Sequence, residues 1–598
     1  MARAFAPSDY DAHGTAIGET RPVPFATRPV LQGTHGMVAA GHYLAAAIGL
    51  RVLEQGGNAV DAGIAAGFAL TVLKPQSNGI GGEVPILIHL ARDGRSVAIN
   101  GQGWAPAAAT IDWFTSHGVK LIPSDGLLPA MVPAQFGSWC AALLEFGTAS
   151  LADVLGPAIE LAESGYPMYT ALRNGILRVA ERFKAEWPSS AAIYLPGGSV
   201  PPDGTLIRNP DWARTMKSVL DAGLRESSRE AAIRASLDYF YRGPVAQQAL
   251  AFSSSQAFAD ATGEAHCGLH QADDWAEYGA SGTRIEEPVS VTYRGIQVQK
   301  CGPWSQGPVF LQHLKLLEGC DLREFGHNTA DYLHVYLECA KLAFADRERY
   351  YGDPAFASVP LERLLSGEYA AERRRLIDLD QACNEFSPGE IAVESREHFA
   401  WPVVTGDTTH VDAVDRRGNL FAATPSGGWI GSSPVVEGLG FPLGTRGQMF
   451  SLDSTHPNAL APRKRPRTTL SPSLALRDGR GWLAFGTPGG DQQDQWTLQF
   501  FLNVVDFGMD LQEALDAPTV HTTHMPGSFY PRAADPGACR IESRIAPDIR
   551  ADLESRGHRV HVDGPWSHGQ VTCVAYEPSG VLSAAASPRG RVAYVMGR

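Results

Sequence analysis

The sequence lacks paired cysteines, long hydrophobic runs and low-complexity tracts. Its eight cysteines are scattered over 598 residues without a Cys-x-x-Cys pair, so neither a zinc site nor a disulfide framework is indicated. No stretch reaches the roughly 18–20 apolar residues of a membrane span, and the first thirty residues show no apolar core of a secretory signal. These absences predict reduced thiols, no metal and a cytoplasmic location.

Charge of one sign is also not concentrated anywhere. The chain carries 50 Lys and Arg against 64 Asp and Glu, a formal net charge of −14, and the acidic residues form no long runs. This balance argues against a nucleic acid or an anionic membrane as partner. A hydrophobic content of 44% with 63 Gly and 41 Pro is typical of a globular protein with many turns. We therefore expect a small-molecule substrate.

Apolar periodicity predicts helices and strands that alternate in both halves of the chain. Residues 42–73 are expected to form two helices, separated by Gly56-Gly57 and with Asn58 capping the second. A long helix is expected from about residue 328, and residues 384–407 are expected to form an exposed segment because they lose periodicity. No linker separates the halves, so the pattern predicts one layered α/β body. Hairpins are expected over 83–100 and 289–301, strands near 409–415, 419–424, 471–477, 482–486, 570–577 and 581–586, and a helix near 495–507.

The stretch TGDTTHVDAVDRRGN, residues 405–419, places two threonines at the start of a predicted strand. Thr408 has good β propensity, and its hydroxyl could simply be satisfied locally. Alternatively, cleavage after Asp407 would give Thr408 a free α-amino group, whose pKa is about 8. That amine can take the hydroxyl proton of the same residue, which makes an N-terminal threonine a nucleophile with its own base.

This run resembles the start of the small subunit in the γ-glutamyltransferase family of N-terminal-nucleophile hydrolases. Further blocks are similar to family blocks and occur in family order, from about residue 28 to the end. The resemblance implies a four-layer αββα fold, a large subunit 1–407 and a small subunit 408–598 that begins with the nucleophilic Thr408. The matching blocks are residues 56–82, 287–299, 340–354, 461–479 and 485–518.

The resemblance also implies roles for several other residues. Gly489 and Gly490 would form an oxyanion hole through their backbone N–H groups, although a plain turn is the alternative. Thr468 and Thr469 align with a serine pair that lines the family's site, unless they are surface turn residues. Ser426 falls near a hydroxyl that supports self-cleavage. Neither a metal nor an organic cofactor is implied.

Two other members of the signature concern the new chain start. Thr409 is expected to help hold the terminus that removal of Asp407 would create. His410 belongs to the same block, and a packed, hydrogen-bonded histidine is as good an interpretation as a catalytic one.

The sequence departs from the family where the substrate's α-amino acid group would bind. Gln102 stands where the family has an arginine for the α-carboxylate, and Arg446 and Met449 stand where it offers Gln and Asp to the α-amino group. Arg446 would suit a carboxylate or a polarised carbonyl, unless it forms a structural ion pair. The pattern is more similar to the branch with oxamate amidohydrolase and glutathione-hydrolase-like proteins.

Three hypotheses follow for the function. The first is an autoprocessed amidohydrolase that cleaves a small amide through an acyl-enzyme and does not favour γ-glutamyl substrates. The second is a γ-glutamyltransferase or glutathione hydrolase, and the third is an unprocessed homologue that only binds a ligand or a partner. After self-cleavage each subunit would have the other as its partner, and a homodimer of such heterodimers stays open.

Overall fold

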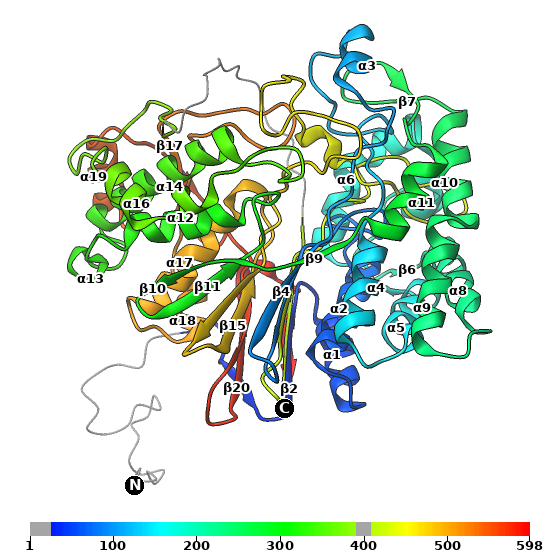
Figure 1. The fold of residues 1–598 in the computed structure, drawn as a ribbon, viewed down its shortest axis with the longest axis horizontal. Helices are drawn as coiled ribbons and strands as arrows, with labels where there is room; N and C mark the ends of the chain where they lie inside the picture. The colour runs from blue at the N-terminus through cyan, green and yellow to red at the C-terminus, as the bar shows by residue number, and fades with distance from the viewer. Residues whose placement is uncertain (1–25, 390–407) are drawn as a thin grey trace.

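The computed structural model describes residues 26–389 and 408–598, and two seven-stranded sheets form its centre (Figure 1). Asp407 and most of the expected exposed segment 384–407 lie outside the described residues. The strands of the first sheet, in spatial order, are β1 (Leu31–Gly33), β20 (Leu582–Ala586), β19 (Thr572–Tyr576), β15 (Arg480–Gly486), β14 (Ser473–Arg477), β11 (Ile296–Lys300) and β10 (Val289–Tyr293). Those of the second are β21 (Tyr594–Gly597), β2 (Gly36–Ala40), β12 (Val411–Asp415), β13 (Leu420–Ala423), β3 (Ile86–Leu90), β4 (Arg95–Asn100) and β9 (Arg284–Glu286).

Each sheet combines strands from both sides of residue 408. In the second sheet, β12 and β13 pair antiparallel with each other and lie between β2 and β3. In the first sheet, β14 pairs with β11 on one side and with β15 on the other. The two halves of the chain therefore build one body, as the absence of a linker predicts.

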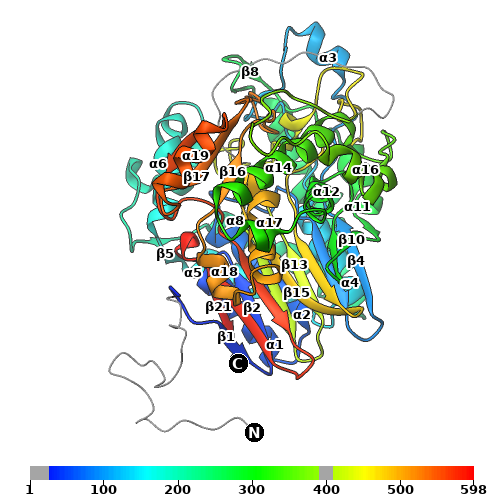
Figure 2. The same ribbon diagram turned by 90° about the vertical axis from the view of Figure 1, so that its left-hand side faces the viewer.

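The two sheets face each other across a layer of apolar side chains. Strand β2 contacts β20, β12 contacts β19, and β13 contacts β15. Figure 2 shows β1 and β21 close together at one end of this pair of sheets. Buried side chains that fill the layer between the sheets include Met37, Leu87, Val414, Leu474 and Val574.

Helices cover the outer side of the second sheet. Helix α2 (Ala59–Leu73) is buried along its whole length, lies on β12 and β13, and carries α1 (Tyr43–Glu54) beside it. Asn58 caps α2 as predicted, because its side chain accepts from the N–H groups of Val60 and Asp61. The other helices on this flank are α4 (Gln135–Phe146), α5 (Leu151–Ser164), α6 (Thr170–Ala185), α7 (Pro188–Tyr194), α8 (Pro210–Gly223), α9 (Arg229–Tyr241), α10 (Pro244–Ser255) and α11 (Ala272–Ser281).

A second group of helices covers the first sheet. Helix α12 (Gly307–Leu317) packs on β10 and β11, α17 (Gln493–Val505) on β15, and α18 (Leu511–Asp516) on β20. The predicted long helix is α14 (Ala330–Tyr350), which packs on α12 and is capped by Thr329. The remaining elements on this side are α13 (Leu322–Phe325), α15 (Leu361–Leu364), α16 (Gly367–Arg374), α19 (Pro547–Ser555), β16 (Val520–Thr522), β17 (Ala538–Glu542) and β18 (Arg559–Asp563).

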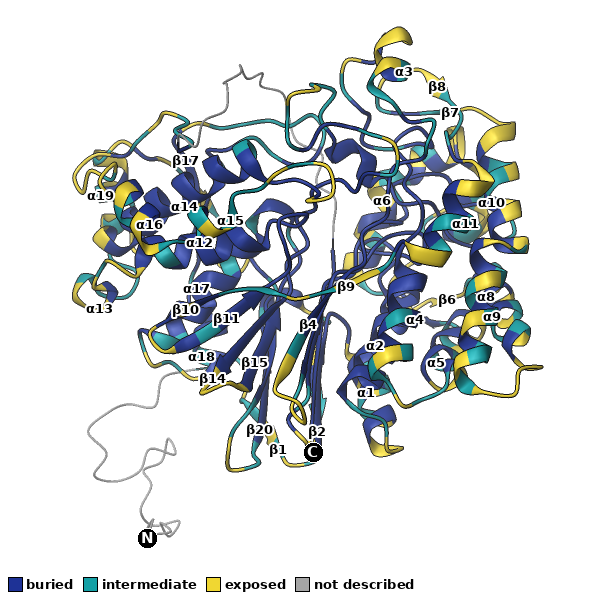
Figure 3. Cartoon of the chain, viewed as in Figure 1, coloured by how far each residue is buried: buried dark blue, intermediate teal, exposed yellow. Residues whose placement is uncertain are grey.

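The burial pattern agrees with this layered arrangement, because the central strands are buried while the outer faces of the flanking helices are exposed (Figure 3). The α/β class is confirmed, and the predicted hairpins and strands lie within a few residues of the observed ones. All eight cysteines are free thiols, as predicted. Within the described ranges, every helix is too short or too polar to cross a bilayer.

Candidate active site

Thr408 lies at the start of the β12–β13 hairpin and is 1% exposed. The hairpin register places Val411 opposite Ala423, and the same register brings Thr408 opposite Ser426, where the two backbones form an isolated bridge. The Oγ1 of Thr408 is 3.1 Å from the Oγ of Ser426. The structure therefore brings these two predicted residues into contact.

Ser426 also contacts Arg446, a third predicted residue. The Nη2 of Arg446 donates to Ser426 Oγ at 2.8 Å, and its Nε donates to Glu83 Oε1 at 2.5 Å. A guanidinium only donates, so Ser426 Oγ accepts on that side and its own hydrogen points elsewhere. Thr408 Oγ1 lies within reach of that hydrogen.

Glu83 is a residue of this site that the sequence reasoning missed. Its backbone exchanges two hydrogen bonds with Ser426, N–H to carbonyl at 2.9 and 3.0 Å. Its carboxylate lies against Gly427, where an added Cβ would come within 2.4 Å of Oε2, and Gly427 has a φ of +70°. Burial raises the pKa of Glu83, while the Arg446 charge opposes that rise. The sequence shows Glu83 only as a glutamate within GIGGEVP. Its partner Arg446 is distant in sequence, so no local pattern marks the residue as part of the site.

The environment of Arg446 is otherwise apolar. Trp429 and Phe529 each lie 5.5 Å from its guanidinium carbon, and Nη1 has the thioether of Met449 as its contact at 3.9 Å. The ion pair with Glu83 is the structural alternative that the sequence left open for Arg446. The charge that a substrate carboxylate would meet is therefore already balanced.

Thr409 and His410 are both fully packed. Thr409 N–H donates to the Pro425 carbonyl at 3.1 Å, and its buried hydroxyl has no partner among the described residues. His410 bonds Thr424 Oγ1 and Asp412 Oδ1, each at 2.8 Å. Its ring lies directly beneath Gly486 at the end of β15, where an added Cβ would be 2.2 Å away. Of the two interpretations of His410, these contacts fit the packed, hydrogen-bonded histidine.

Gly489 and Gly490 form the turn between β15 and α17. Their φ values of +127° and +59° suit glycine, and a Cβ on Gly489 would come within 2.2 Å of the Trp496 ring. The Gly489 carbonyl accepts from Gln492 N–H at 3.2 Å, which fixes the peptide that carries the Gly490 N–H. Neither glycine N–H donates to an acceptor within residues 26–389 and 408–598.

This glycine turn and the Thr408 hairpin lie in one region. Phe529 packs beside Gly490, 3.1 Å from where its Cβ would be, and also flanks Arg446. Gly486, at the end of the strand that leads to the turn, covers His410. Two unpaired N–H groups close to a buried hydroxyl are an arrangement that an oxyanion hole could use.

The remaining predicted residues are buried, so the surface-turn alternative for Thr468 and Thr469 is wrong; each is 1% exposed. The Thr468 carbonyl accepts from Gln306 N–H at 2.8 Å. Gln102 follows β4, and its carbonyl accepts from Tyr278 at 3.3 Å. The hydroxyl of Thr469 and both amide atoms of Gln102 have no partner in the described part of the chain. Buried polar groups without partners are costly and suit a ligand contact.

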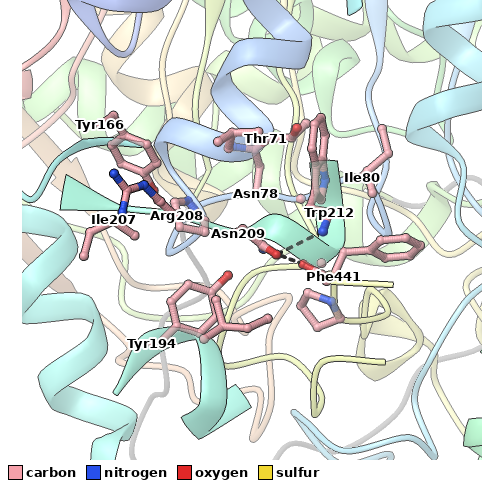
Figure 4. A pocket seen from close by; sticks show the side chains of 17 residues that line it. Thr71, Asn78, Ile80, Tyr166, Tyr194, Ile207, Arg208, Asn209, Trp212 and Phe441 are labelled. Carbon is pink, nitrogen blue, oxygen red and sulfur yellow. Dashed lines mark hydrogen bonds between the residues drawn. The ribbon is translucent and has the colours of Figure 1, made fainter. Parts of the chain in front are cut away.

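A cavity beside Gly428 is too small to hold a substrate (Figure 4). Its volume is about 20 Å³, enough for one water. The Nε1–H of Trp212 is buried there without a protein partner among the described residues. Asn78, Asn209 and Tyr194 are among the other polar residues of its lining, so the cavity suits a structural water.

One cluster of possible metal ligands occurs in the described residues, formed by His334, Glu338 and His558. It lies on the α14 flank. Lys341 Nζ donates to Glu338 Oε1 at 2.6 Å, and the two histidines bond each other at 2.9 Å. These contacts pair the clustered atoms with one another and with Lys341, and they leave the Nδ1 of His558 buried without a partner among the described residues.

The family profile of Gamma-glutamyltranspeptidase matches residues 45–596. The chain belongs to this family. The acylase ACY 1 proenzyme of Pseudomonas sp. strain SE83 is 34% identical over 93% of this chain and 92% of its own length. The glutathione hydrolase proenzyme of Escherichia coli K12 is 30% identical over 94% and 91%. The oxamate amidohydrolase proenzyme of Klebsiella pneumoniae is 29% identical over 93% and 97%.

Solved structures superpose along most of the chain. The structure of LmbA2991HD has a TM-score of 0.91 and 46% identity over 96% of this chain and all of its own. Cephalosporin acylase from Bacillus halodurans has a TM-score of 0.81 and 32% identity over 97% and 99%. The predicted family is confirmed. The prediction of an enzyme that acts on amide bonds is confirmed at the level of the family.

Proposed function

We propose that the chain is a self-cleaving amidohydrolase with Thr408 as an N-terminal nucleophile and a four-layer αββα fold. The observation that carries this proposal is the buried Thr408–Ser426 pair, with its hydrogen bond to Arg446, beside a glycine turn whose two N–H groups are unpaired. Relatives named as proenzymes support processing into subunits.

In the proposed maturation, Thr408 Oγ1 attacks the carbonyl carbon of Asp407. The C–N bond breaks as the acyl group moves to oxygen, and the nitrogen takes up the hydroxyl proton to become the α-amino group of Thr408. Water then hydrolyses the ester, which leaves a carboxylate on Asp407 and restores the threonine hydroxyl. Ser426, fixed by Arg446, donates to Thr408 Oγ1 and holds it, while Thr409 anchors the new terminus through Pro425.

The same hydroxyl then attacks a substrate amide. The Thr408 amine accepts the hydroxyl proton and passes it to the leaving amine, and the N–H groups of Gly489 and Gly490 stabilise the tetrahedral oxyanion. Water attacks the resulting ester and releases the acid. Each oxyanion-hole donor is worth roughly 10²–10³ in rate in comparable enzymes.

Specificity is proposed to avoid the γ-glutamyl group. Gln102 offers no charge to an α-carboxylate, and Arg446 is neutralised by Glu83. Trp429, Phe529 and Met449 form an apolar cluster around Arg446. We propose a small amide whose acyl part carries no α-amino acid group and packs on this cluster, with Thr468, Thr469 and Gln102 contacting its polar atoms.

A panel of acyl p-nitroanilides tests this proposal. Wild-type protein is expected to hydrolyse apolar acyl anilides faster than the γ-glutamyl anilide, and Thr408→Ala is expected to abolish both activities. Thr71→Ala is the matched control, because its buried hydroxyl donates only to the Phe68 carbonyl of its own helix. Preference for the γ-glutamyl anilide would instead favour the second candidate, a glutathione hydrolase like the Escherichia coli relative. A protein that stays intact and inactive would favour the third hypothesis, a homologue that only binds.

A cytoplasmic location stays a proposal, and cell fractionation tests it.

A further inference from the structure

The turn at Gly489 and Gly490 is held by a buried side chain that bonds the Gly490 and Asp491 carbonyl groups and has no role in the proposed chemistry. We propose that Gln306, held by Arg347, is a positioning residue that keeps the Gly490 N–H aimed at the reacting carbonyl. This inference rests on the proposed function and extends it to residues that do not touch substrate.

Gln306 connects two parts of the site. Its Nε2 donates to both the Gly490 and Asp491 carbonyls at 3.4 Å. Its backbone N–H donates to the Thr468 carbonyl at 2.8 Å. Gln306 precedes α12 and is fully buried, so its amide cannot exchange these partners for water. One side chain therefore fixes the turn relative to the Thr468–Thr469 segment.

Arg347, from α14, in turn fixes Gln306. Its Nη1 donates to Gln306 Oε1 at 3.0 Å and also bonds the Asp491 carboxylate. Its Nη2 donates to the Pro526 carbonyl at 3.1 Å. Because Oε1 must accept from the arginine, the amide orientation is set and its N–H groups must face the glycine turn.

Both peptide planes next to Gly490 are consequently fixed. Gln492 N–H holds the Gly489 carbonyl, and Gln306 holds the Gly490 carbonyl. The Gly490 N–H points away from the Gly489 carbonyl across the same plane, so it stays unpaired. Two glycines at positive φ would otherwise let these planes rotate, and pre-aligned donors are what gives an oxyanion hole its effect.

Gln306→Leu tests the role, with Gln312→Leu as matched control. Gln312 is equally buried and its amide bonds Asp346 and Tyr351, away from the glycine turn. With the anilide that wild type hydrolyses fastest, Gln306→Leu is expected to lower kcat roughly 10- to 100-fold with KM within about twofold. Gln312→Leu should lose similar stability and keep kcat within about twofold of wild type.

Gln306→Glu separates positioning from support of Arg347. A glutamate keeps the acceptor for Arg347 but cannot donate to the Gly490 carbonyl, so kcat should fall even though the contact with Arg347 is kept. The affinity of an arylboronic acid, which forms a tetrahedral adduct on the threonine hydroxyl, should fall with kcat. Wild-type kcat in Gln306→Leu or Gln306→Glu would overturn the positioning role alone. An inactive wild type would overturn the proposed function, and this role with it.

Discussion

Arg446 connects an acidic partner and a hydroxyl that are far apart in sequence. It pairs with Glu83 and donates to Ser426, with both charged side chains almost completely buried. Removing one partner of a buried pair leaves the other charge uncompensated and costs about 3–5 kcal/mol. Replacing both partners removes that penalty.

We therefore predict that Arg446→Met destabilises the protein by about 3–5 kcal/mol, and that Glu83→Gln/Arg446→Met recovers part of this loss. Both variants should mature slowly, because neither holds Ser426. Chemical unfolding and intact mass check the two effects. A double variant no more stable than Arg446→Met would show that the pair is not what stabilises this site.

Ser426 offers a second test at this scale. Ser426→Ala removes the hydroxyl that contacts Thr408, so self-cleavage should slow by roughly 10-fold, in line with loss of one positioned hydrogen bond of about 1.4 kcal/mol. Ser432→Ala is the control, since its buried hydroxyl bonds the Trp429 and Leu443 carbonyls in the same loop region. Equal cleavage rates for the two variants would contradict the assignment of Ser426.

At the scale of elements, helix α2 is held close to its sheet by small residues. A Cβ on Gly63 would lie 2.2 Å from the Phe421 ring on β13. We predict that Gly63→Ala costs about 1–3 kcal/mol through overpacking. In α5, Gly156 has open space around its Cβ position, so Gly156→Ala should be neutral or stabilising by up to about 1 kcal/mol. If Gly63→Ala and Gly156→Ala lowered the unfolding midpoint equally, the result would contradict this account of the packing.

How much the sequence predicts also depends on scale. Local signals located the Asn58 cap, the long helix and the β12–β13 hairpin, because periodicity and capping act over a few residues. Sequence alone could not place Glu83 beside Arg446 or Gln306 beside Gly490, because these contacts depend on how distant strands and helices pack. The Thr408 assignment came from a family block, whereas the balance of charge at Arg446 required the structure.

At the scale of the whole molecule, the proposed subunits 1–407 and 408–598 interleave. Strands β12 and β13 pair with β2 and β3 of the other subunit, and β14 pairs with β11. We predict that the cleaved chains co-elute in size-exclusion chromatography under native conditions and separate only on a denaturing gel. Native elution of two separate chains would contradict the single interleaved body.

Self-cleavage at one bond is the central claim, and mass spectrometry tests it most directly. Purified wild-type protein should give two masses, one of which corresponds to residues 408–598 with Thr408 at its N-terminus. Thr408→Ala should give one mass for the full 598-residue chain. A wild-type protein that stays full length, or a Thr408→Ala variant that is cut at the same bond, would contradict the account.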